Sequence, residues 1–125
     1  MIEAYSLNVD VTADTAIPFN SVTIQKGCTV TRASVDTFNL NKCGVYMIAV
    51  DTSSEAEATI QLFKDGVAQP QAQSTGESHQ SFTTLVQVDK NNSCCPCASP
   101  TSIQIINTGA TATFTNANIT ITKIV

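Results

Sequence analysis

The sequence is poor in charge, in histidine and in long apolar runs. Charged residues make up 13% of the 125, and the six lysines and arginines are scattered from Lys26 to Lys123. A chain without a basic patch has no surface to follow a phosphate backbone, which argues against nucleic acid as a partner. No apolar run approaches the ~20 residues that a membrane-spanning helix needs. The sequence therefore predicts binding to neither nucleic acid nor membrane.

The first residues, Met1 to Tyr5, combine neither a basic region nor an apolar core, so they are not typical of a secretory signal. We expect synthesis in a cytosol, after which the product stays there or leaves as part of a larger particle. Reduced thiols are the default in that compartment. The five cysteines are an odd number, so at least one is unpaired within a single chain.

β-branched residues are abundant, and threonine alone occurs 18 times. Such side chains suit a pleated sheet better than a helix. Short alternating runs separated by turn residues predict about ten strands, over residues 3–9, 17–24, 28–31, 35–40, 45–52, 58–64, 67–73, 78–89, 102–107 and 117–124. Asp65-Gly66 between two of these runs predicts a tight hairpin. The spacing is typical of a single all-β sandwich.

One segment, residues 45–50, is apolar on both faces of its predicted strand. One face carries Tyr46, Ile48 and Val50, and the other carries Val45, Met47 and Ala49. An antiparallel sandwich usually exposes one sheet face to water, so the second apolar face needs a cover. We favour a neighbouring subunit, and an intrachain loop is the alternative. The residues predicted for a subunit interface are Val45, Tyr46, Met47, Leu85, Ile106 and Phe114.

Several short stretches resemble the tumour-necrosis-factor-like and complement-globular-head superfamily. They are Phe38 to Leu40, Gly44 to Ile48 with its Gly-x-Tyr motif, Thr59 to Val67, and the final stretch Ile119 to Val125. The resemblance implies an antiparallel jelly roll of about ten strands that assembles as a homotrimer. Within the superfamily the chain is similar to the heads of collagen-like exosporium proteins of spore formers and to trimeric fibre or decoration proteins of bacteriophages. A collagen-like stalk does not precede this head, which favours a virion component.

These inferences predict a non-enzymatic structural protein at the virion surface, made in the cytoplasm of a bacterial host. It would be a capsid decoration, head-fibre or fibre-head protein whose partners are its own copies and the major capsid protein or another virion protein. Residues 1–15 are predicted to form a strand and a particle-anchoring segment, followed by the jelly roll over 16–125. The alternative is a receptor- or glycan-binding head of a fibre or spore-surface protein, with loops over 51–57, 69–80 and 91–100 binding a cell-surface glycan.

Cys94, Cys95 and Cys97 are the only concentrated soft metal ligands. Together with Cys28 or Cys43 as a fourth thiolate, they are candidates for a zinc site. Their spacing is not a paired Cys-x-x-Cys, and adjacent cysteines fit a shared tetrahedral site poorly. Free thiols and intersubunit disulfides therefore stay open beside zinc, and no cofactor is the leading expectation.

The remaining candidate ligand residues are Asp51, Glu55, Glu57 and the single histidine, His79. A histidine can serve as a base or a metal ligand, but we interpret His79 as a solvated residue at a loop edge. Carboxylates in a polar loop can bind calcium, and solvated charges are the simpler interpretation. No nucleophile motif accompanies His79, so the sequence predicts no catalytic site.

Overall fold

The structure, a computed structural model, describes residues 1–88 and 100–125. These ranges form eleven strands, and no helix among them is long and apolar enough to cross a bilayer. The strands are β1 (Ile2–Val11), β2 (Thr15–Ala16), β3 (Ser21–Gln25), β4 (Val30–Ser34), β5 (Thr37–Leu40), β6 (Gly44–Ser54), β7 (Ala58–Lys64), β8 (Val67–Gly76), β9 (His79–Val88), β10 (Thr101–Asn107) and β11 (Ala112–Lys123).

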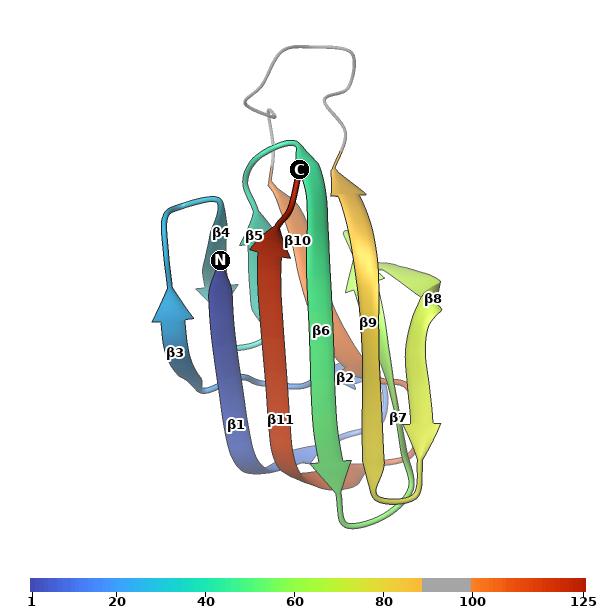
Figure 1. The fold of residues 1–125 in the computed structure, drawn as a ribbon. Helices are drawn as coiled ribbons and strands as arrows, with labels where there is room; N and C mark the ends of the chain where they lie inside the picture. Colours follow the sequence, from blue (N-terminus) through green and yellow to red (C-terminus); the bar gives the residue numbers. More distant parts are fainter. Residues whose placement is uncertain (89–99) are drawn as a thin grey trace.

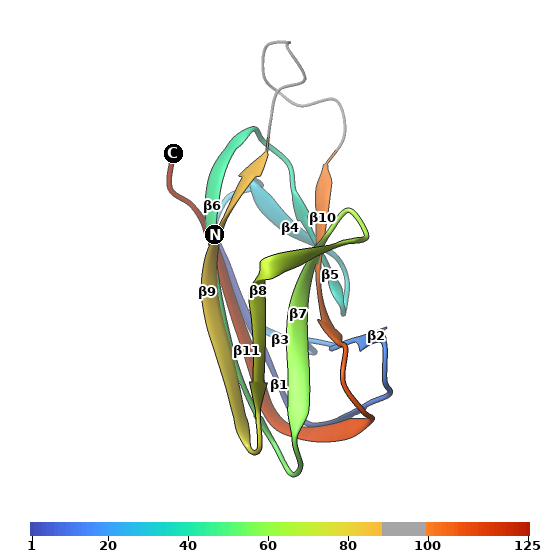
Figure 2. The same ribbon diagram turned by 90° about the vertical axis from the view of Figure 1, so that its right-hand side faces the viewer.

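The strands form two antiparallel sheets packed face to face (Figures 1 and 2). The front sheet has the order β3-β1-β11-β6-β9, and the back sheet has the order β4-β5-β10-β7-β8, with β2 pairing to β10. The first and last long strands, β1 and β11, are neighbours, and β6 lies between β11 and β9. The predicted all-β jelly-roll sandwich is confirmed.

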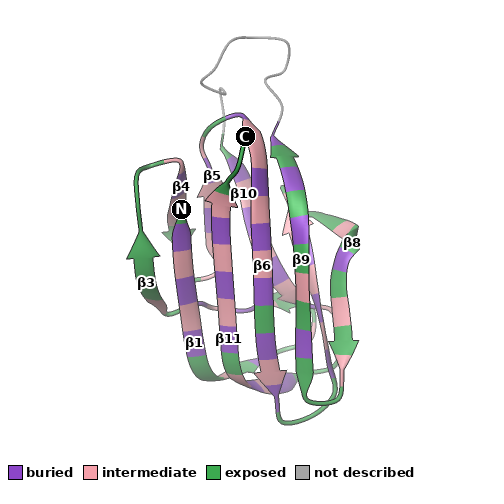
Figure 3. Cartoon of the chain, viewed as in Figure 1, coloured by how far each residue is buried: buried purple, intermediate pink, exposed green. Residues whose placement is uncertain are grey.

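The core lies between the two sheets and follows the alternation of each strand. In Figure 3 buried and partly exposed residues alternate along β1, β11 and β6 of the front sheet. The largest fully buried side chains are Tyr46, Phe19, Phe38, Phe114, Ile2, Ile17, Leu40, Ile48, Ile60, Leu62, Ile103 and Ile105. The rings of Phe19 and Phe38 lie 5.7 Å apart and tilted by 54°, within the range of favourable aromatic contact.

Most predicted strands occur near their expected positions, and the exceptions have a backbone explanation. The segment predicted as a strand over 17–24 is paired with β1 only from Ser21. Before that point the Ile17 and Phe19 N–H groups donate to carbonyls of other segments, Ile105 at 2.8 Å and Val35 at 2.7 Å. At the other end of the chain, β11 begins at Ala112, five residues before the prediction, because its first residues complete the pairing with β1.

Two turns depend on positive backbone angles. Asp65 and Gly66 have φ of 51° and 80°, as the predicted hairpin between β7 and β8 requires. Gly44, the glycine of the Gly-x-Tyr motif, has φ of 145° and begins β6 against the end of β11. A side chain at Gly44 would collide with the Val125 carbonyl oxygen and Lys123, so the close approach of the C-terminal residues requires glycine.

The first fifteen residues contain β1, which takes part in the front sheet. β1 is an interior strand of the front sheet, and its Ile2, Ala4 and Val11 are buried in the core. The predicted N-terminal strand thus lies between β3 and β11, and the boundary predicted between residues 15 and 16 stays a prediction. A role of this segment in attachment to a particle stays a prediction.

Candidate functional site

The candidate site is the face of the front sheet that points away from the core, called here the outer face. On β6, alternate residues from Tyr46 to Val50 enter the core, while Val45, Met47 and Ala49 on the other side are only partly buried. The expectation of a strand that is apolar on both sides is met. Figures 1 and 2 show that no described segment crosses the middle of this face. An intrachain cover for these side chains is therefore not found among the described residues.

The upper half of the outer face, near the C-terminal end of β11, carries an apolar patch of Val45, Met47 and Leu85. The β6–β9 register places Met47 directly opposite Leu85, so the two side chains share one face. Leu85 is 58% exposed. A leucine so exposed beside two partly exposed apolar side chains is a surface that gains from being covered.

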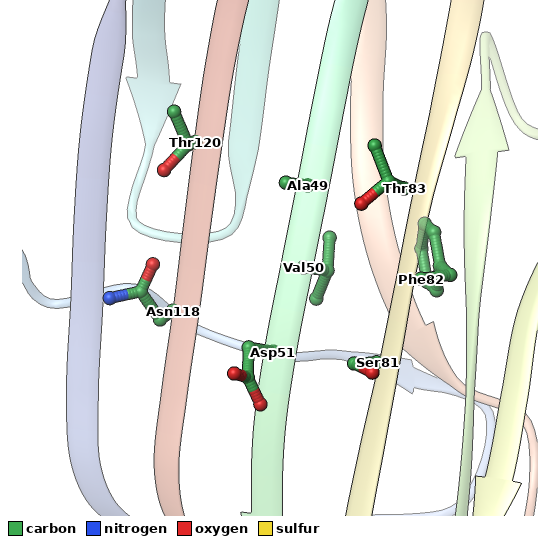
Figure 4. Close-up of a pocket in the computed structure, with 8 residues that line it drawn as sticks. All are labelled: Ala49, Val50, Asp51, Ser81, Phe82, Thr83, Asn118 and Thr120. Carbon is green, nitrogen blue, oxygen red and sulfur yellow. The ribbon is translucent and has the colours of Figure 1, made fainter.

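The lower half of the outer face is polar and contains a hollow of about 420 Å³ (Figure 4). The hollow spans β11, β6 and β9 and is lined by Ala49, Val50, Asp51, Ser81, Phe82, Thr83, Asn118 and Thr120. Cross-strand pairing aligns Asn118, Asp51 and Ser81 in one row, with the row of Ala49 next to it. The surface is hollow at this point because the side chains of Ala49 and Ser81 are short.

Asp51 at the hollow is paired with His79. The Nε2 atom of His79 and the Oδ1 atom of Asp51 are 2.5 Å apart. The two residues lie diagonally across β6 and β9, since Asp51 is opposite Ser81 and His79 is opposite Ser53. The Asp51 side chain is 66% exposed and the His79 side chain is 57% exposed, so the pair contributes little to the stability of a single chain. What it does is orient the carboxylate.

Comparisons with known proteins agree with this architecture and do so through structure alone. No protein-family model matches the chain, and no curated protein matches its sequence. Among solved structures, the globular domain of zebrafish complement 1qA protein aligns with a TM-score of 0.77 at 12% identity, over 99% of this chain and 96% of that one. The PRD1 vertex protein P5 aligns with a TM-score of 0.68 at 13% identity, over 99% and 96%. The Eiger TNF from S. frugiperda aligns with a TM-score of 0.69 at 12% identity, over 99% and 92%.

The chain has the tumour-necrosis-factor-like, complement-globular-head fold. The predicted superfamily resemblance is thereby confirmed for the fold. At 12–13% identity these similarities establish architecture only, and functional statements rest on the residues of this chain.

Three of the six predicted interface residues lie away from the outer face of the front sheet. Tyr46 and Phe114 are fully buried between the sheets, so they are unable to contact a second chain. The Tyr46 hydroxyl is also engaged within the chain, where it donates to the Lys42 carbonyl at 2.6 Å. Ile106 lies on β10 of the back sheet and points away from the core there, on the opposite side of the molecule from Met47. Val45, Met47 and Leu85 stay candidates.

The predicted ligand residues are only partly brought together. Asp51 and His79 meet, and both are in strands, not in the loop that we expected. Glu55 and Glu57 are exposed in the connection from β6 to β7 and make no side-chain hydrogen bond or ion pair in the described part. Across residues 1–88 and 100–125, no group of three or more His, Cys, Asp or Glu is arranged to hold a metal ion.

The candidate zinc ligands lie mostly outside the described residues. Cys94, Cys95 and Cys97 lie outside the described residues. Cys43 is disulfide-bonded, and Cys28 is a free, exposed thiol. Zinc and calcium binding otherwise stay predictions.

Sequence reasoning missed the polar residues from other strands that complete the outer face, namely Tyr5, Ser81, Asn118 and Thr120. Tyr5 is opposite Asn118 in the β1–β11 pairing and is partly exposed. The alternation of the predicted first strand contained the signal, because Ala4 and Ser6 point to the core and Tyr5 between them points away.

Proposed function

We propose that the chain is a non-enzymatic head module that assembles as a homotrimer through the outer face of its front sheet. It acts as a structural component at the surface of a bacteriophage particle, as a capsid decoration, head-fibre or fibre-head protein. The observation that carries this proposal is the apolar patch of Val45, Met47 and Leu85, whose side chains stay partly or largely exposed among the described residues.

The energetics favour burial of this face between copies. Apolar surface removed from water contributes roughly 25 cal/mol per Å², and a stable interface buries about 800 Å² on each partner. Association entropy and side-chain ordering offset much of this gain. The long, fully paired strands of the front sheet suit such an interface because little backbone ordering is required when copies meet.

The particle-surface role is supported by similarity to a vertex protein, and the non-enzymatic role by the site itself. The PRD1 vertex protein P5 shares the fold over almost the whole chain. In the described part, His79 forms no hydrogen bond with a serine, threonine or cysteine side chain that would act as a nucleophile. The major capsid protein or another virion protein is the proposed attachment partner.

Light scattering coupled to size-exclusion chromatography tests the assembly. The expected mass is three times 13.2 kDa, or 39.6 kDa, at micromolar concentration. Leu85→Lys places a charge in the patch and should shift the protein to 13.2 kDa, because a buried unpaired charge is costly. Val67→Lys is the matched control, since Val67 is 62% exposed but lies at the start of β8 in the back sheet. A wild-type monomer at micromolar concentration would contradict the proposal.

The location is tested separately by mass spectrometry of purified particles from the producing host. We expect the chain among the virion proteins in a copy number that is a multiple of three. A chain found only in the soluble lysate, with none on particles, would contradict the virion role while leaving the trimer intact.

A further inference from the structure

The hollow on the outer face is the feature that a packed interface has to fill. We infer that Tyr5 of one copy occupies the hollow of the next copy, with its hydroxyl donating a hydrogen bond to the Asp51 carboxylate. This inference rests on the proposed homotrimer and adds the residue that fixes how neighbouring copies are positioned.

The lining of the hollow specifies the chemistry of its occupant. The short Ala49 side chain accepts an apolar body, while the Ser81, Thr83 and Thr120 hydroxyls, the Asn118 amide and the Asp51 carboxylate surround it with polar atoms. One Asp51 oxygen is taken by His79, and the other forms no hydrogen bond in the described part. A side chain with an apolar ring and a donor at its tip satisfies both requirements, and tyrosine is that side chain.

Tyr5 is the residue of this chain that meets the description. Of the two tyrosines, Tyr46 is buried in the core with its hydroxyl bonded to Lys42. Tyr5 is on the outer face and partly exposed, and its hydroxyl has no hydrogen-bond partner among the described residues. Aromatic anchors of this kind carry much of the binding energy of protein interfaces.

The placement of Tyr5 relative to the hollow suits a ring of copies. Tyr5 is on β1, whereas Asp51 is on β6, two strands away across β11. Strands are spaced about 4.8 Å apart, so the two backbones are roughly 10 Å from each other. Tyr5 thus lies beside the hollow of its own chain, next to Asn118, and is a neighbouring but separate part of the same face. Such a contact is heterologous, and it closes into a ring of three when the rotation from one copy to the next is a third of a full turn.

The direct test is photo-crosslinking of the full chain with p-benzoylphenylalanine in place of Tyr5. A trimer mixed from isotopically light and heavy chains should give intersubunit cross-links to peptides containing Ala49, Ser81 or Asn118. The control carries the same group in place of Phe63, which lies on the back sheet, and should not cross-link to these peptides.

A double-mutant cycle tests the hydrogen bond. Loss of a bond to a charged group weakens a contact roughly tenfold or more, so Tyr5→Phe should raise the trimer dissociation constant on the order of a thousandfold over three equivalent contacts. Asp51→Asn should act similarly, and Tyr5→Phe should add little in its presence. Thr75→Val removes a hydroxyl from β8 of the back sheet and should leave the dissociation constant unchanged.

The outcomes separate this inference from the proposed function. A wild-type trimer whose dissociation constant is unaffected by Tyr5→Phe, with cross-links that avoid the hollow, overturns the Tyr5 contact and leaves the homotrimer standing. A wild-type monomer overturns both. Hollow-directed cross-links together with non-additive effects of the two substitutions support the inference.

Discussion

Replacing Gly44 with alanine probes how the C-terminal residues fix the end of β6. Gly44 has φ of 145°, and a side chain there would collide with the Val125 carbonyl oxygen and approach the Lys123 Cε atom to 2.6 Å. The next residue, Val45, accepts a hydrogen bond from the Ile124 N–H at 2.8 Å. The substitution therefore imposes a disfavoured backbone angle and also displaces the segment that bonds Val45.

The two costs can be separated by a second glycine. A disfavoured φ costs about 1–3 kcal/mol, and each lost backbone hydrogen bond costs about 1 kcal/mol, so Gly44→Ala should lower the free energy of unfolding by about 2–4 kcal/mol. Gly27 has φ of 70°, but no atom lies within 4 Å of the position that an alanine Cβ would take there. Gly27→Ala should therefore lose about 1 kcal/mol, from the backbone angle alone.

Urea unfolding followed by circular dichroism measures both variants. All samples are compared at one chain concentration, because assembly would couple stability to concentration. Deleting residues 124 and 125 in the Gly44→Ala background should recover part of the loss by removing the Val125 oxygen. Equal losses for Gly44→Ala and Gly27→Ala, with no recovery on deletion, would refute the role of the close approach.

Two further substitutions test the core. Gln80 is buried, and its side-chain amide donates to the Ser54 hydroxyl at 3.0 Å and accepts from the Thr52 hydroxyl at 2.7 Å. Gln80→Ala should lower the free energy of unfolding by about 2–4 kcal/mol, because it leaves buried polar groups without partners. A loss below about 1 kcal/mol in urea unfolding would contradict this network. Phe114→Ala should cost about 3–5 kcal/mol in the same assay but cause no loss of assembly while the chain stays folded. Dissociation of the trimer while the Phe114→Ala chain stays folded would instead support Phe114 as an interface residue.

The sequence predicted strands, hairpin and superfamily well because these depend on local patterns. Two residues specify the Asp65-Gly66 turn, and the six residues 45–50 are enough to show that their strand is apolar on both faces. What local alternation does not specify is the sheet to which a strand belongs. Ile106 and Met47 both point away from the core, yet topology places them on opposite sides of the molecule. Tyr46 belongs to the face of residues 45–50 that the alternation allows to enter the core, and it lies there fully buried, although it is also among the residues predicted for the interface.

The candidate site was less predictable because its residues come from four strands that are distant in sequence. Asp51 and His79 were both singled out, but a diagonal contact across β6 and β9 requires the register of the two strands. No motif links Asn118 with Tyr5, and only the neighbouring positions of β1 and β11 bring them to the same row.

The division of the outer face into an apolar patch and a polar hollow implies a division of roles in assembly. Apolar contact is non-directional, so the patch of Val45, Met47 and Leu85 favours association without fixing one register of neighbouring copies. A carboxylate oxygen buried in an interface is costly unless a donor reaches it, so Asp51 disfavours every arrangement that buries its second oxygen without a donor. The exposed contact between Asp51 and His79, which contributes little to the single chain, would then matter mainly when the face is covered. On this view the patch supplies affinity, and the hollow selects the one arrangement in which a ring of copies closes.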